Sequence, residues 1–292
     1  MKRLYLRHIL CPIDFSAVSA ASLATAGAMA RARDAELRTM HVVPAEGPAA
    51  PEGQGSLEQQ AFMSRLRTAL SEAAPGYERT GAAVRQGDPA TQILRVARTM
   101  PADLIVTGAP GADRPERPMG PVASVVIARS QCPVLAVPAL AFESRPKETG
   151  LFSRIVCAVD LTPSSAGVIR QALSLAWESQ GHLTCVCVAG TGTSTAPSAM
   201  RDELLAAIPP DASGWCETDV IVTKGMASTE IVRIAGALNA DVVVIGAPRR
   251  WTSTTHAVLS RPLCPVLVTH DARALPWPAA RKPSARVPTP VS

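Results

Sequence analysis

The stretch that decides the fold is Arg7-His8-Ile9-Leu10-Cys11-Pro12-Ile13-Asp14, because the chain contains it twice. The second copy lies 146 residues further on and reads Ser153-Arg154-Ile155-Val156-Cys157-Ala158-Val159-Asp160. Each copy is a short apolar run that ends in an aspartate, which is typical of a buried strand with a polar residue at its carboxyl end. A repeat at this distance in a chain of 292 residues indicates that a whole domain has been duplicated.

Other segments recur in the same order and extend the duplication over most of the chain. The segment 37–43 recurs at the same spacing of 146, the segment 102–110 recurs at a spacing of 138, and Cys132-Pro133-Val134-Leu135 recurs at a spacing of 132. The spacing shrinks only between these segments, so the second copy has lost eight residues in one connection and six in another. Loops tolerate such deletions, and we therefore expect both copies to keep one fold.

Each copy contains five short apolar runs separated by helical patterns. In the first copy the expected strands lie near 7–13, 37–43, 80–86, 103–108 and 134–138. Strands that alternate with helices pair in parallel and are joined by right-handed crossovers. The expected fold class is therefore α/β, with two tandem five-stranded parallel sheets.

Polar residues mark where several helices should begin. Ser16 is a suitable N-cap for the helix after the first strand, and Asp88-Pro89 combines a cap with a proline at the first helical position. Thr162-Pro163 is expected to play the same part in the second copy.

These patterns divide the chain into two domains, a connection and a tail. The expected limits are 1–139 for the first domain, 140–152 for the linker, 153–270 for the second domain and 271–292 for the tail. Because the tail is rich in proline and alanine, we expect it to be disordered.

The composition argues against several classes of protein. Hydrophobic residues make up 47% of the chain but aromatic residues only 3%, which suits cores of Ala, Val, Leu and Ile around a buried parallel sheet. Of the net charge of +5, the last 22 residues hold +3, and no basic cluster precedes them, so no nucleic-acid partner is expected. The first ten residues lack a signal-peptide pattern. No apolar stretch approaches the roughly 20 residues that cross a bilayer, so we expect a cytoplasmic protein without a membrane partner.

Several motifs together carry a family resemblance. They are Asp14-Phe15-Ser16 at a strand end, His41-Val42-Val43 at the next, Gly108-Ala109-Pro110-Gly111 after the fourth strand, Gly120-Pro121-Val122 after a loop, and Cys132-Pro133-Val134-Leu135. In combination they resemble the universal stress protein (UspA-like) family, and the likeness covers both copies. The resemblance implies that each sheet is doubly wound, in a Rossmann-like fold of the adenine nucleotide alpha hydrolase type, and that the chain is a tandem two-domain member.

The resemblance also implies a site for ATP or AMP in the first domain. In such sheets ligands lie beyond the carboxyl ends of the strands, where the winding direction reverses. In nucleotide-binding members the residue that matches Asp14 contacts adenine, the residue that matches Val42 lines its pocket, and a glycine-rich loop wraps the ribose and phosphates. Glycine lets backbone N–H groups approach phosphate, and a helix N-terminus favours an anion. The binding residues carried over are Asp14, Val42, Thr107, Gly108, Gly111, Gly120 and Val122.

The glycine-rich loop departs from the family's ATP-binding pattern, which is Gly, two residues, Gly, nine residues, then Gly followed by Ser or Thr. In the first copy only eight residues separate Gly111 from Gly120, and Pro121 stands where the hydroxyl residue belongs. Proline offers neither a hydroxyl nor an N–H group to a phosphate. In the second copy Arg249 replaces the second glycine, so we expect that site to be degenerate.

No catalytic residue and no metal site is expected. The crevice positions do not assemble into a Ser-His-Asp set, paired carboxylates or a metal-ligand cluster, and His41 is expected to be packed or hydrogen-bonded. The leading interpretation is a regulatory stress-response protein that binds nucleotide in its first domain and is at most a weak ATPase. The alternative is a nucleotide-free interaction scaffold of the same fold, with unknown protein partners.

The last strand of each copy should leave an open sheet edge. In relatives the final strands of two domains pair across an interface that resembles a two-fold axis. The segments Pro133–Val137 and Pro265–Thr269 are therefore expected to pair within one chain as an intramolecular pseudo-dimer, which would cover both edges. Further association into a homodimer stays open.

Overall fold

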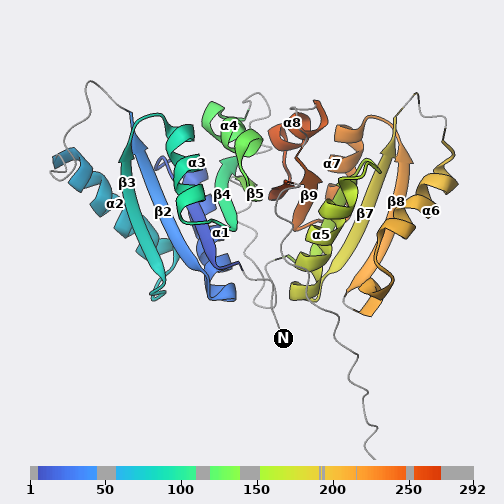
Figure 1. Ribbon diagram of the computed structural model, residues 1–292, viewed down its shortest axis with the longest axis horizontal. Coiled ribbons are helices and arrows are strands. Elements are labelled where there is room, and N and C mark those ends of the chain that lie inside the picture. Colours follow the sequence, from blue (N-terminus) through green and yellow to red (C-terminus); the bar gives the residue numbers. More distant parts are fainter. Residues whose placement is uncertain are drawn as a thin grey trace, which may run out of the picture.

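The computed structural model describes residues 6–44, 57–109, 119–138, 152–190, 192, 195–214, 216–247 and 253–270. Within these ranges the chain forms two α/β halves that share one sheet (Figure 1). The proposed linker and the tail from residue 271 fall almost entirely outside the described residues.

The two halves contain the same succession of elements. The strands and helices of the first half are β1 (His8–Pro12), α1 (Ala17–Arg33), β2 (Glu36–Val43), α2 (Leu57–Ala73), β3 (Thr80–Gln86), α3 (Pro89–Thr99), β4 (Leu104–Ala109), α4 (Pro121–Arg129) and β5 (Val134–Pro138). Those of the second half are β6 (Arg154–Val159), α5 (Ser165–Ser179), β7 (His182–Ala189), α6 (Pro197–Ala207), a 3-10 turn (Pro210–Gly214), β8 (Glu217–Lys224), α7 (Ala227–Ala237), β9 (Val242–Gly246), α8 (Ser253–Ser260) and β10 (Val266–Thr269). The five strands expected in the first copy are all present, with limits within two residues of those predicted.

The strand order is β3-β2-β1-β4-β5-β10-β9-β6-β7-β8, so β3 and β8 form the outer edges (Figure 1). Within each half every pairing is parallel, and the direction of winding reverses between β1 and β4 and between β6 and β9. The predicted doubly wound α/β class is confirmed.

The halves join through their last strands. β10 runs antiparallel to β5, with Leu267 opposite Leu135, and every residue of both strands is buried. Two side-chain contacts cross the same junction: Arg33 of α1 pairs with Glu178 of α5, and His270 bonds to the carbonyl of Ile127. The predicted pseudo-dimer is confirmed, and the pairing gives each strand edge the hydrogen-bond partners that it would otherwise lack.

Two apolar cores cover the two faces of the sheet. One core packs the sheet against α1, α2, α5 and α6, and includes Leu23, Leu66 and Ile169. The other packs it against α3, α4, α7 and α8, and includes Ile93, Ile127 and Ile234. The strands therefore read as nearly continuous apolar runs, as expected where helices cover both faces.

The predicted helix cap is confirmed for α3 in the first half, whereas α5 in the second half begins at a different residue from the one predicted. Asp88 caps α3 by accepting a hydrogen bond from the backbone N–H of Thr91 at 2.8 Å. In contrast, α5 begins only at Ser165, and its cap position is Ser164 rather than Thr162. The Thr162 hydroxyl instead donates to the carboxylate of Asp160 at 2.7 Å, so it is already engaged in the preceding turn.

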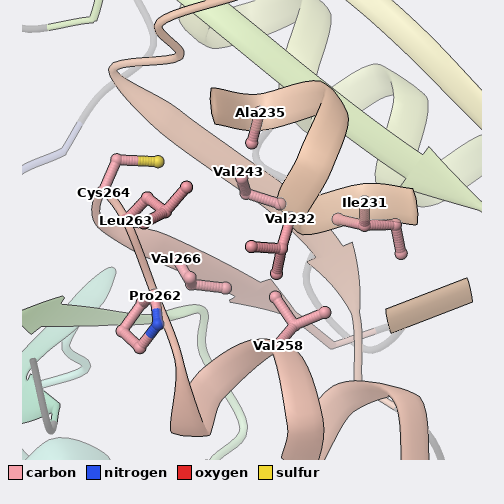
Figure 2. Close-up of a pocket in the computed structure, with 9 residues that line it drawn as sticks. All are labelled: Ile231, Val232, Ala235, Val243, Val258, Pro262, Leu263, Cys264 and Val266. Carbon is pink, nitrogen blue, oxygen red and sulfur yellow. The ribbon is translucent and has the colours of Figure 1, made fainter. Parts of the chain in front are cut away.

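An apolar groove lies over the second half, between α7, α8 and the start of β10 (Figure 2). The groove is partly open to solvent and is lined by Ile231, Val232, Ala235, Val243, Val258, Pro262, Leu263, Cys264 and Val266. At two lining positions the first half carries a bulkier residue: Leu94 matches Val232 and Ile105 matches Val243. The lost side-chain volume accounts for part of the groove.

Filling this groove should stabilise the second half. In Val232→Leu the added methylene enters apolar surroundings, which is worth about 0.8 kcal/mol when fully buried. We therefore expect a higher midpoint of thermal unfolding, measured by differential scanning calorimetry. The reverse exchange in the first half, Leu94→Val, is the matched control and should lower the midpoint; a lower midpoint for Val232→Leu would show that the groove cannot accept the extra carbon.

The junction between the halves should weaken in mild acid. His270 Nε2 lies 2.7 Å from the Ile127 carbonyl, which can only accept, so Nε2 carries the proton and the buried Nδ1 has no partner among the described groups. Burial lowers the pKa of His270 below its ordinary 6.5, and the bond to Ile127 offsets only part of this effect.

As pH falls through about 6.5, the unfolded chain therefore binds a proton that folded His270 resists, and the free energy of unfolding decreases. We expect His270→Gln, which can still donate to Ile127 but does not titrate, to lose less stability than wild type between pH 7.5 and 5.5 in urea titrations. Equal losses in both proteins would contradict this assignment.

Candidate functional site

The candidate site is the crevice where the winding of the first half reverses. Because β1 and β4 are parallel neighbours, with Leu10 opposite Ile105, their carboxyl ends meet at one edge of the sheet. Asp14 follows β1 there, and Gly108 lies near the end of β4. The structure therefore brings the tip of β1 and Gly108 of β4 to the same edge of the sheet.

Asp14 is held by a tight turn that also starts helix α1. Its Oδ1 accepts hydrogen bonds from the Ser16 hydroxyl at 2.6 Å and from the Ser16 backbone N–H at 3.0 Å. The Ser16 Oγ in turn accepts from the backbone N–H of Ser19 at 3.2 Å, which caps the helix. Partial burial raises the pKa of Asp14, but the hydrogen bonds from Ser16 and Ser19 outweigh it and leave the pKa below its ordinary value. The carboxylate is thus ionised at neutral pH, and it remains exposed to a ligand.

The second half repeats this turn. Asp160 Oδ1 accepts from the hydroxyls of Thr162 at 2.7 Å and Ser165 at 3.1 Å, and from the Thr162 backbone N–H at 3.2 Å. The intervening residues, Phe15 and Leu161, both have left-handed backbones, with φ of 62° and 57°. The strand-end aspartate therefore has a folding role in both halves, whatever it binds.

The other predicted residues differ in how far they are exposed. Val42 and Thr107 are each only 9% exposed, so they can present little more than an edge to a ligand. Gly120 is exposed at the N-cap of α4, and Val122 is partly buried in the first turn of that helix. Gly111 lies outside the described residues.

Helix α4 packs against the strand that carries Gly108. It contacts β4, and Met119 just before it is buried in the same core as Val126 and Ile127. The N-cap residue Gly120 makes no side-chain cap bond, and Pro121 at the first helical position has no N–H group. The next backbone N–H groups in this turn are left to solvent or to an anion.

Gly108 has a packing role that the sequence did not reveal. A Cβ atom at this position would stand 2.6 Å from Cγ1 of Val18 in α1, which is closer than real Cβ atoms approach. At the equivalent Gly246 the corresponding distance, to Cγ2 of Val168, is 3.1 Å. Gly108 therefore lets α1 lie directly on β4, and Gly246 lets α5 lie directly on β9.

An aromatic and basic cluster beside Asp14 was also missed. Phe15 packs its ring 4.8 Å from His41 and 5.9 Å from Phe62, and the Arg65 guanidinium lies 4.1 Å from the centre of the Phe15 ring. Nδ1 of His41 donates to the carbonyl of Ile13 at 2.9 Å, so this histidine is hydrogen-bonded as expected. The only available sequence signal was the scarcity of phenylalanine, with 4 in the chain.

Two searches of the described ranges concern other kinds of site. Among those residues no group of three or more His, Cys, Asp or Glu side chains could hold a metal ion. None of the helices described is both long enough and apolar enough to cross a bilayer.

Comparison with known proteins shows the family of the chain. The model of the universal stress protein family matches residues 6–138 and 151–270. The chain belongs to the universal stress protein family. Because the two matches follow one another, it is a tandem member, which confirms the resemblance drawn from the repeated motifs.

Solved structures share the fold over nearly the whole length of this universal stress protein. A universal stress protein from Archaeoglobus fulgidus DSM 4304 is 18% identical with a TM-score of 0.69, and the match covers 90% of this chain and 98% of that one. A functionally unknown protein from Pseudomonas aeruginosa PAO1 is 21% identical with a TM-score of 0.64, and the match covers 93% and 95%. A search of curated proteins found no match.

The packing role of Gly108 can be separated from any ligand role. Gly108→Ala should destabilise the first half by about 1–3 kcal/mol, because the new methyl group collides with Val18. Adding Val18→Ala should restore most of the loss, and Gly246→Ala should cost less because its contact is longer. Urea unfolding without ligand measures all four proteins; an unchanged free energy for Gly108→Ala would mean that the helix shifts freely and that packing does not require the glycine.

Proposed function

We propose that this tandem universal stress protein binds an adenine nucleotide, AMP or ATP, in the crevice of its first half and acts as a regulatory protein in the stress response. The observation that carries the proposal is the arrangement at the winding reversal. There an exposed, ionised Asp14 carboxylate follows β1, and Gly108 lies in the neighbouring strand β4, against which α4 packs.

The chemistry of the crevice suits the two ends of a nucleotide. An ionised carboxylate such as that of Asp14 accepts hydrogen bonds from an exocyclic amino group like that of adenine. The positive end of the α4 dipole and the backbone N–H groups after Pro121 favour a phosphate. Val42 and Thr107 would form the floor beneath the base, and Gly120 and Val122 the phosphate side.

Pro121 bears on which nucleotide fits better. It removes one backbone N–H and the hydroxyl that the family pattern has next to the third glycine. Fewer donors at the start of α4 match a single phosphate better than three, so AMP should bind at least as tightly as ATP. Gly111 completes the proposed set of binding residues.

The second half is proposed to bind no nucleotide and to serve as the partner domain of the pseudo-dimer. Its Asp160 accepts three hydrogen bonds within its own turn. We also propose that the protein binds its nucleotide without catalysing a reaction and that it is cytoplasmic. The domain limits 1–139 and 153–270 are part of the same proposal. Steady ATP hydrolysis that Asp14→Ala abolishes would overturn the non-catalytic part.

Isothermal titration with AMP and ATP tests the site. We expect one site per chain in wild type, and an affinity at least about tenfold lower in Asp14→Ala, since a hydrogen bond to a charged group contributes roughly 1.5–3 kcal/mol. Asp160→Ala is the matched control because it loses the same kind of turn in the other half, and its affinity should be unchanged. Wild type that binds neither nucleotide would reject the proposal in favour of the nucleotide-free scaffold.

A further inference from the structure

Helices α2 and α6 occupy matching places in the two halves, which allows their residues to be compared one by one. Leu66 in α2 and Leu204 in α6 are separated by 138 residues, and both are 0% exposed against the same core face. Arg65 therefore corresponds to Glu203, and Phe62 corresponds to Met200. The charge beside the crevice is reversed between the halves.

In the first half the charge is positive. The centre of the Arg65 guanidinium lies 4.1 Å from the ring centre of Phe15, the residue next to Asp14, and 5.8 Å from that of Phe62. Within the described ranges no carboxylate is within ion-pair distance of Arg65. Stacking on a ring uses the flat face of a guanidinium and leaves the in-plane N–H donors for another partner. Arg65 is thus an exposed hydrogen-bond donor that lies against Phe15, the residue that follows Asp14.

In the second half the charge is negative. Leu161 and Cys187 stand where the first half has Phe15 and His41, so the aromatic support is gone. Asp160 follows β6, and Glu203 lies on α6 next to the buried Leu204, where the helix packs against β7 and β8. Two carboxylates here repel an anion, whereas the first half offers one carboxylate and one guanidinium.

We propose that Arg65 is a ligand-contacting residue that gives the first crevice its preference for an anionic nucleotide, and that Glu203 excludes such a ligand from the second. This inference rests on the proposed function. The ligand belongs to the class of phosphate-bearing adenine compounds. Its base faces Asp14, and Arg65 and the start of α4 both attract the negative charge of its phosphate. Phe15 and Phe62 lie against the guanidinium, and His41 packs against both rings.

A purely structural role for Arg65 makes different predictions. If the side chain only shields Phe15 and Phe62 from water, its loss should change stability but not the response of binding to salt. If it contacts the ligand, its charge should appear in the salt dependence of the dissociation constant, because exposed charges are screened by ions.

Titrations of AMP into the full-length protein decide between these roles. Arg65→Glu, which installs the residue of the second half, should weaken binding at least tenfold, and Arg65→Lys should recover most of the affinity. Between 50 and 300 mM NaCl the dissociation constant should rise less in Arg65→Glu than in wild type. Arg67→Glu is the control, because residue 67 is also exposed but projects about 200° away around the helix, and it should leave the affinity unchanged.

The outcomes separate the two proposals. Wild type that binds no AMP rejects the nucleotide site itself, and the role of Arg65 with it. Wild type that binds AMP while Arg65→Glu binds equally well rejects only the role of Arg65. An equal loss in Arg65→Glu and Arg67→Glu also rejects it, since the effect would then reflect the overall charge of α2. Thermal unfolding of each variant without ligand shows that the fold is intact.

Discussion

The antiparallel pairing of β5 with β10 is the constraint on which the rest of the molecule depends. Both strands are buried along their whole length, so unpaired backbone groups at these edges would be costly. The duplicated chain satisfies both edges within itself and forms one ten-stranded sheet. The pairing also fixes how the two crevices lie relative to each other, and it brings α1 and α5 close enough for the Arg33–Glu178 ion pair.

Duplication provides an internal comparison that separates folding from function. The turn after the first strand is the same in both halves: a carboxylate, a residue with a left-handed backbone, and a hydroxyl residue that bonds to the carboxylate. The turn leads from strand to helix in both halves, so this aspartate serves folding in each of them as well as any ligand in the first. Features that only the first half has, above all Arg65 and its aromatic neighbours, are stronger evidence for a ligand than features that both halves share.

The second half departs from the first in ways that lower its stability or expose apolar surface. Met226 stands where Asp88 caps α3, so α7 lacks a side-chain cap, and the Met226 side chain is 70% exposed. An N-cap is worth about 0.5–2 kcal/mol. Together with the groove beside Leu263, these differences show that the second half has diverged at its surface while its sheet kept the common register.

The sequence by itself determined the strands and the duplication, because apolar runs and their spacing are local properties. The central seam followed from the resemblance to relatives whose last strands pair. It misjudged the start of α5, since Thr162 had a competing partner in Asp160. Only the tertiary structure decided what surrounds Asp14. Arg65 lies over Phe15 because Leu66 anchors α2 to the sheet, and Gly108 is needed because Val18 lies so close. Distances between a helix and a strand arise from packing across the whole core, which no local pattern encodes.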